Sequence, residues 1–83
     1  MGRGMSGDRD LAPLPATPLG RYRHYKGGEY EVFGVARHSE TLEIVVVYQT
    51  LYDDSGWWIR PFDMFTGTLE VDGVVRKRFE YVG

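Results

Sequence analysis

The sequence predicts a small all-β domain, and three observations support this fold class. Short runs alternate hydrophobic with polar residues, as strands with one buried face do. Glycine, proline and aspartate interrupt these runs at short intervals, which is typical of turns. No segment keeps a helical period over ten residues. Because 83 residues allow only one core, we expect a single all-β domain over residues 20–83.

The first two strands are expected at residues 20–25 and 28–37. The glycines after Lys26 indicate the turn between them, since glycine tolerates positive φ. A glycine within a strand often marks a bend, so we expect the second strand to curve at Gly34. Its alternation places four residues on one face: Tyr30, Val32, Gly34 and Ala36.

The third strand is expected at residues 42–50, where four consecutive β-branched residues favour a strand over a helix. These residues are apolar on both faces, which is typical of a central strand that is covered on each side. The chain's own loops, its N-terminal tail or a second copy of the protein could cover the face that carries Val45 and Val47. A homodimer is therefore one option.

The remaining residues predict one more strand, a short helical turn and a hairpin. The strand at residues 57–61 ends at Pro61, which has no amide hydrogen for a ladder, and one 3₁₀ turn follows at residues 62–65. Asp72 and Gly73 predict a type I′ turn between the last two strands. Five to six antiparallel strands can reduce their exposed edges by curling into a small, partly open barrel. This order resembles SH3-like barrels and is also compatible with a small β-roll.

The composition constrains the N-terminal segment, the partners and the location of the protein. Residues 1–19 hold three of the four prolines and no aromatic residue, so we expect a flexible tail. The formal charge of −2 gives no global attraction for phosphates. No apolar run approaches the roughly 18 residues of a membrane span, and the N-terminus lacks the apolar segment of a secretory signal. We expect a cytoplasmic protein without membrane contact.

The neighbouring residues His38, Ser39 and Glu40 suggest a hydrolase or transferase, but they suit a turn better. A nucleophile needs its base within about 3 Å and a third group to orient that base, which neighbours in sequence rarely provide. The chain has no cysteine, and its two histidines have no metal-ligand spacing. We therefore expect no catalytic residue, no metal and no cofactor, with His38 acting with Ser39 or Glu40 as the enzymatic alternative.

The adjacent tryptophans Trp57 and Trp58 are more informative. Adjacent strand residues face opposite ways, so both indoles cannot enter one core. If Trp57 faces inward, Trp58 shares the other face with Arg60, where a guanidinium can stack on an indole. The rings could also simply build and cover a small core. The ligand-binding hypothesis places six residues on one face or rim: Tyr25, His38, Ser39, Tyr48, Trp58 and Arg60.

Basic residues form two clusters, one over residues 21–26 and one over residues 76–78. With aromatic residues between them, such clusters can contact phosphates, each contact adding to a salt-dependent affinity. Lysine and arginine on an edge strand also prevent edge-to-edge association, and that explanation fits residues 76–78 equally well. Binding of single-stranded nucleic acid is therefore an alternative.

Several motifs together resemble one known family. They are Y-R-H-Y-K-G at residues 22–27, Y-E-V-x-G-V-A-R-H-S-E-T at residues 30–41, V-V-Y at 46–48, W-I-R-P at 58–61 and M-F at 64–65. In this order they resemble the bacterial family known as domain of unknown function 1653. The resemblance covers residues 20–83 and implies a small bacterial, cytoplasmic protein. It assigns no activity and no catalytic residue.

The sequence alone thus predicts an all-β, non-catalytic binding or accessory module with an aromatic and arginine ligand face. Its partner would be a small ligand, a peptide or single-stranded nucleic acid. The enzymatic alternative stays open at this point.

Overall fold

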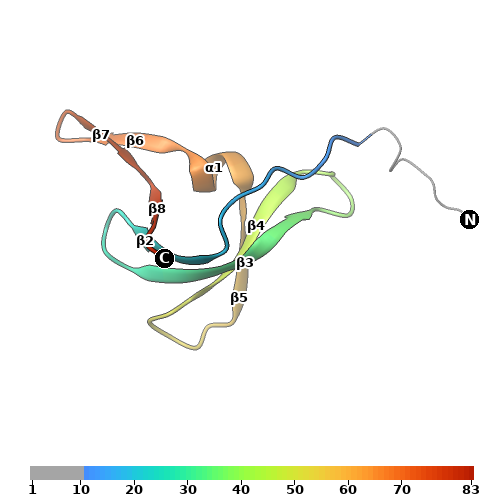
Figure 1. Cartoon of the computed structure of the whole chain (residues 1–83), viewed down its shortest axis with the longest axis horizontal. Coiled ribbons are helices and arrows are strands. Elements are labelled where there is room, and N and C mark those ends of the chain that lie inside the picture. Colours follow the sequence, from blue (N-terminus) through green and yellow to red (C-terminus); the bar gives the residue numbers. More distant parts are fainter. Residues whose placement is uncertain (1–10) are drawn as a thin grey trace, which may run out of the picture.

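The computed structural model describes residues 11–83, and over this range the chain is all-β, as predicted. Seven strands form two antiparallel sheets, with one short helix between them (Figure 1). In chain order the elements are β2 (Gly20–His24), β3 (Glu29–Arg37), β4 (Ile44–Thr50), β5 (Trp57–Pro61), α1 (Phe62–Thr66), β6 (Thr68–Val71), β7 (Val74–Lys77) and β8 (Phe79–Tyr81).

The larger sheet has the strand order β5-β4-β3-β2-β8, and the smaller one is the hairpin β6-β7. The hairpin prediction is confirmed, since Asp72 and Gly73 have φ angles of 53° and 80° and join strands that pair at Val71 and Val74. The structure has seven strands where we expected five to six, because the last segment is divided at Arg78. Its first half pairs in the hairpin, and its second half crosses to pair with β2.

The large sheet curls without closing (Figure 1). Its edge strands β5 and β8 are not paired with each other, so the described residues form no closed barrel. The predicted 3₁₀ turn is instead one turn of α-helix, in which the Thr66 hydroxyl donates to the Phe62 carbonyl at 2.9 Å. Phe65 points from this turn into the core and is only 1% exposed.

The predicted faces of β3 are wrong beyond Val32, because a β-bulge shifts the register between Val32 and Gly34. After the bulge, Val35 lies opposite the buried Val46, whereas Gly34 and Ala36 lie opposite Val47 and Val45 on the other face of the sheet. The strand is irregular where the glycine predicted a bend. The cause is an extra residue rather than close packing, since a Cβ on Gly34 would meet no atom within 4 Å.

The core occupies one face of the large sheet, which we call the core face, and the opposite face is the outer face. Aromatic rings dominate the core, and Phe65 is stacked on Phe79 at a centroid distance of 4.2 Å. Burying a side chain of this size contributes roughly 1.5–3 kcal/mol, so α1 is fixed mainly by Phe65. The buried core cluster is Tyr22, Tyr30, Val32, Val46, Tyr48, Phe65 and Phe79.

The central position of β4 is confirmed. It lies between β3 and β5, and the adjacent residues Val45 and Val46, which face opposite ways, are 4% and 0% exposed. Both faces of the strand are therefore covered at this point.

Residues 11–19 form no helix or strand, but they contact the domain at two places. Arg37 donates to the Ala12 carbonyl at 2.7 Å, and the Tyr22 hydroxyl donates to the Pro18 carbonyl at 2.7 Å. The first ten residues of the predicted tail lie outside the described residues, so its flexibility stays a prediction. No helix within residues 11–83 is long and apolar enough to cross a membrane.

Candidate functional site

The turns of the large sheet divide the predicted ligand residues between its two ends. The β2–β3 and β4–β5 turns lie at one end, where Leu51 donates its amide to the Glu29 carbonyl at 3.0 Å and the Tyr52 ring lies against Gly28. The β3–β4 turn, with His38 and Ser39, is at the opposite end, beyond the last paired residues of β3 and β4. The six residues of the ligand-binding hypothesis therefore do not converge on one site.

His38 is engaged by its own turn. Its Nδ1 accepts hydrogen bonds from the backbone amides of Glu40 at 3.1 Å and Thr41 at 3.2 Å, and its amide donates to the Glu43 carbonyl at 2.7 Å. Ser39 and Glu40 are exposed. These bonds are those of a polar turn in which the imidazole stabilises the backbone.

Tyr48, Trp58 and Arg60 do come together, on the core face. Cross-strand pairing places Trp58 beside Tyr48 and Arg60 beside Val46, so both residues lie on the core face. Trp57 therefore faces outward, the reverse of the arrangement in which Trp57 faces inward. The guanidinium of Arg60 lies 5.2 Å from the centre of the Phe79 ring, and its Nη2 donates to the Tyr48 hydroxyl at 3.5 Å. Arg60 thus covers the aromatic core rather than stacking on Trp58.

The β4–β5 turn holds Trp58 in place. Its indole Nε1 donates to the Ser55 hydroxyl at 2.9 Å, and Ser55 donates through both its hydroxyl and its amide to the Asp53 carboxylate, at 2.7 Å and 3.0 Å. The Thr50 hydroxyl donates to the same carboxylate oxygen. Hydrogen bonds from Thr50 and Ser55 lower the pKa of Asp53, because they favour the charged carboxylate.

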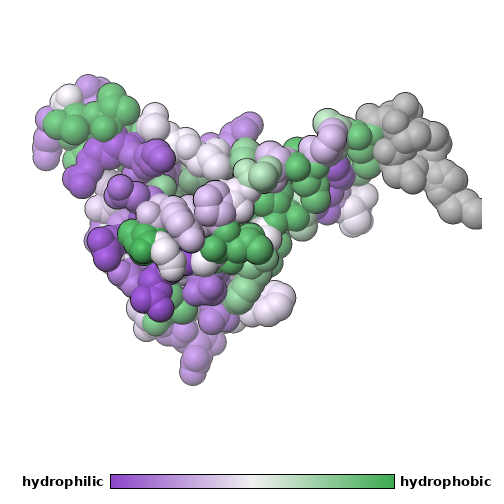
Figure 2. Space-filling model, viewed as in Figure 1, coloured by the Kyte–Doolittle hydropathy of each residue, from purple (hydrophilic) through white to green (hydrophobic). Residues whose placement is uncertain are grey.

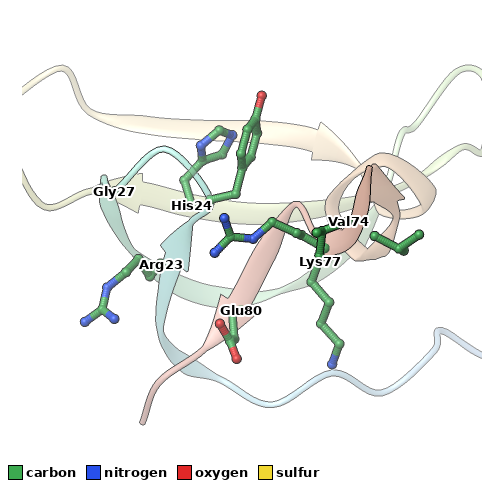
Figure 3. A pocket seen from close by; sticks show the side chains of 9 residues that line it. Arg23, His24, Gly27, Val74, Lys77 and Glu80 are labelled. Atoms are coloured by element: carbon green, nitrogen blue, oxygen red, sulfur yellow. The ribbon is translucent and has the colours of Figure 1, made fainter. Parts of the chain in front are cut away.

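A cleft of about 460 Å³ opens beside this end of the sheet, between β2 and the projecting β6–β7 hairpin (Figure 3). Arg23 and His24 line it from β2, Lys77 lines it from β7, and Glu80 contributes from β8. We call it the basic cleft. Its lining residues are Arg23, His24, Tyr25, Gly27, Val74, Val75, Arg76, Lys77 and Glu80.

The fold brings Arg23 of the first basic cluster and Arg76 and Lys77 of the second to one cleft. Arg78 fixes the arrangement, since its amide donates to the Gly67 carbonyl at 3.0 Å and its carbonyl accepts from the Tyr25 amide at 3.0 Å. The first bond ties the base of the hairpin to the segment after α1, and the second ties it to the β2–β3 turn. Hydrophobic residues gather at the outer tip of the hairpin (Figure 2), where Val74 and Val75 are 58% and 68% exposed.

The charges of the cleft are unevenly balanced. Within residues 11–83, both ion pairs are made by Glu29, with Arg23 at 3.0 Å and with Arg21 at 4.0 Å. Arg76 and Lys77 form no ion pair in this part of the chain, and Glu80 is the one acidic residue among those that line the cleft. The cleft therefore has uncompensated positive charge, although the whole chain is slightly acidic.

His24 links the cleft to the aromatic core. Its ring lies 4.5 Å from the Tyr25 ring and 4.9 Å from the Phe79 ring. Burial lowers the pKa of His24, and the charges of Arg60, Arg78 and Lys26 lower it further. Because Nδ1 accepts a hydrogen bond from the Lys26 amide at 3.1 Å, the neutral imidazole carries its proton on Nε2.

The sequence hypothesis did not include His24, Arg23, Arg76 or Lys77 in the ligand face. The two basic clusters were visible, but their meeting depends on β8 pairing with β2, which no local pattern indicates. Within residues 11–83, no three histidine, aspartate or glutamate side chains lie close enough to hold a metal ion. The cleft is thus suited to binding an anion by hydrogen bonds and charge.

Comparisons with known proteins identify the family. The family model described as a protein of unknown function (DUF1653) matches residues 20–81. A crystal structure of a DUF1653 protein from Bordetella bronchiseptica is 40% identical in sequence and superimposes with a TM-score of 0.75, covering 81% of this chain and 88% of that one. No curated protein matches at a significant level. The chain belongs to the DUF1653 family.

Proposed function

We propose that this chain is a non-catalytic binding module that takes single-stranded nucleic acid in the basic cleft. One observation carries the proposal: Arg23 and, about fifty residues later in the sequence, Arg76 and Lys77 line one cleft. The His24 and Tyr25 rings, which pack on each other at a centroid distance of 4.5 Å, line the same cleft. Phosphates would contact these basic side chains, and a base would stack on the Tyr25 ring.

The chemistry of the cleft favours a phosphate over a neutral ligand. Arg76 and Lys77 offer charged donors that no carboxylate in residues 11–83 occupies at ion-pair distance. The Nε2–H of neutral His24 is a further donor beside the cleft. Contacts between basic side chains and phosphates release counterions, which gives an affinity that falls with salt.

The aromatic residues favour a single strand over a duplex. Tyr25 is half-buried in the cleft lining, and Tyr52 is 61% exposed at the same end of the sheet. Stacking a base on such a ring contributes roughly 1–3 kcal/mol, but only an unpaired strand can present its bases in this way. The rings therefore give the module a preference for single strands over duplexes, which charge alone does not provide.

Charge substitutions of opposite sign test the proposal. Lys77→Gln should weaken binding of a labelled oligonucleotide and reduce the dependence of log affinity on log salt by about 0.7, the single-strand value for one phosphate contact. Glu80→Gln should instead strengthen binding about fivefold, because it removes a negative charge worth on the order of 1 kcal/mol in water. Fluorescence anisotropy over a salt series measures both effects.

Two controls separate a site from a general charge effect. Arg21→Gln removes a positive charge that lies outside the cleft lining, and Glu43→Gln removes a negative charge at the other end of the sheet. Both should leave the affinity nearly unchanged. Equal effects of Lys77→Gln and Arg21→Gln would contradict a binding site in the cleft.

A further inference from the structure

The outer face of β5 exposes large hydrophobic side chains. Trp57 is 69% exposed and Ile59 is 58% exposed, and both project from the same side of the strand. The Trp57 ring packs on Phe33, the bulged residue of β3, at a centroid distance of 4.6 Å, and Phe33 is itself 37% exposed. Clustered apolar exposure of this kind is typical of a protein–protein interface.

The same strand has an unpaired backbone edge. Over residues 11–83, β5 is hydrogen-bonded to β4 on one side and to no strand on the other. Edge strands are normally protected by charged side chains, and β8 at the opposite edge carries Glu80. The five residues of β5 include no lysine and no acidic residue, and the guanidinium of Arg60, the one charged residue of this strand, lies over the Phe79 ring of the core. Pro61 removes only one amide donor, at the end of the strand.

We propose that β5 pairs antiparallel with β5 of a second copy of this chain, about a two-fold axis that passes through Ile59. In this register Ile59 faces Ile59 of the second copy, Trp58 faces Arg60, and Trp57 faces Pro61. Residues that face each other across an antiparallel pair project from the same side of the sheet, so each of these contacts is made twice.

The sequence of β5 is complementary to itself in this register. Trp58 of one copy lies beside Arg60 of the other on the core face, so its indole adjoins the guanidinium that covers the Phe79 ring, where cation–π contact is favourable. On the outer face, the exposed Trp57 and Ile59 of both copies form one continuous apolar surface. A second copy therefore fits both faces of the strand and its free edge at once, joining two five-stranded sheets into one.

Charge reversal at the axis tests the pairing by sedimentation of the full chain over a concentration series. The wild-type chain should sediment as a dimer. Ile59→Glu and Ile59→Lys should each sediment as monomers, because like charges meet at the axis. An equal mixture of the two variants should restore the dimer, because the axis then brings glutamate against lysine. A wild-type chain that stays monomeric, or a mixture that stays monomeric, overturns the proposal.

Matched variants on the hairpin control for a general effect of charge. Val75 is as exposed as Ile59 but lies on β7, so Val75→Glu and Val75→Lys should both remain dimeric. Dissociation of the Val75 variants would contradict an interface at β5. Amide hydrogen exchange of the wild-type chain provides a readout without substitution: protection of β5 amides should rise with concentration, and exchange that is independent of concentration overturns the proposal.

Discussion

At the residue scale, His24 lines the basic cleft and has a pKa that responds to its surroundings. Burial and the nearby charges of Arg60, Arg78 and Lys26 lower its pKa below the usual value of 6.5. We expect the imidazole NMR signals of His24 to titrate below pH 6.5 in the free protein. A bound phosphate chain should raise the pKa of His24, because its negative charge offsets those cations. The signals of His38, at the other end of the sheet, should not respond to the ligand.

The lowered pKa of His24 also determines the direction in which the free energy of unfolding changes with pH. The unfolded chain takes up this proton at a higher pH than the folded chain, so the free energy of unfolding should fall as pH drops from about 6.5 through the folded pKa. Above pH 6.5 the effect is absent. Urea denaturation at a series of pH values measures it, and His24→Gln should remove this part of the dependence. A His24 pKa at or above 6.5 would contradict the described environment.

Residue patterns in the sequence were sufficient to predict local geometry but not to predict the site. Asp72 and Gly73 predicted the hairpin correctly, because a type I′ turn has strong local requirements. The polar turn at His38 also has a local explanation in its own hydrogen bonds. The position of Arg60 could not be predicted, since the Phe79 ring beneath it comes from a strand that is distant in sequence.

At the element scale, the bulge in β3 explains the main error in the predicted faces. One extra residue at Phe33 reverses the alternation that follows, so a pattern read without the bulge assigns every later side chain to the wrong face. The division of the last strand at Arg78 is similar. Alternation continues across residues 74–81, but the two halves pair with different partners.

Alanine substitutions at two glycines should change the free energy of unfolding in different ways. A Cβ on Gly67 would lie 2.8 Å from the Asp63 carbonyl oxygen of α1, so Gly67→Ala should reduce the free energy of unfolding by roughly 1–3 kcal/mol. A Cβ on Gly34 would meet nothing within 4 Å, so Gly34→Ala should be neutral or stabilise by roughly 0.4–1 kcal/mol. Thermal unfolding compares them, and equal melting temperatures would contradict the packing after α1.

At the scale of the whole molecule, the fold class followed from the sequence because it depends on the alternation and turn residues of each segment. The addition of β8 to the large sheet did not, since β8 pairs with β2 across more than fifty residues of chain. That same pairing creates the basic cleft. Local patterns therefore predicted the strands and the two basic clusters, whereas the site arises from topology.

Binding of a single strand in the basic cleft is the central claim, and a two-dimensional amide NMR titration tests it most directly. The ligand is a short single-stranded oligonucleotide at low and at moderate salt, with a duplex of the same sequence as control. We predict shifts confined to residues 23–27 and 74–80 that persist at moderate salt and are weaker with the duplex. A spectrum without shifts, or shifts centred on residues 38–43 instead, would contradict the claim.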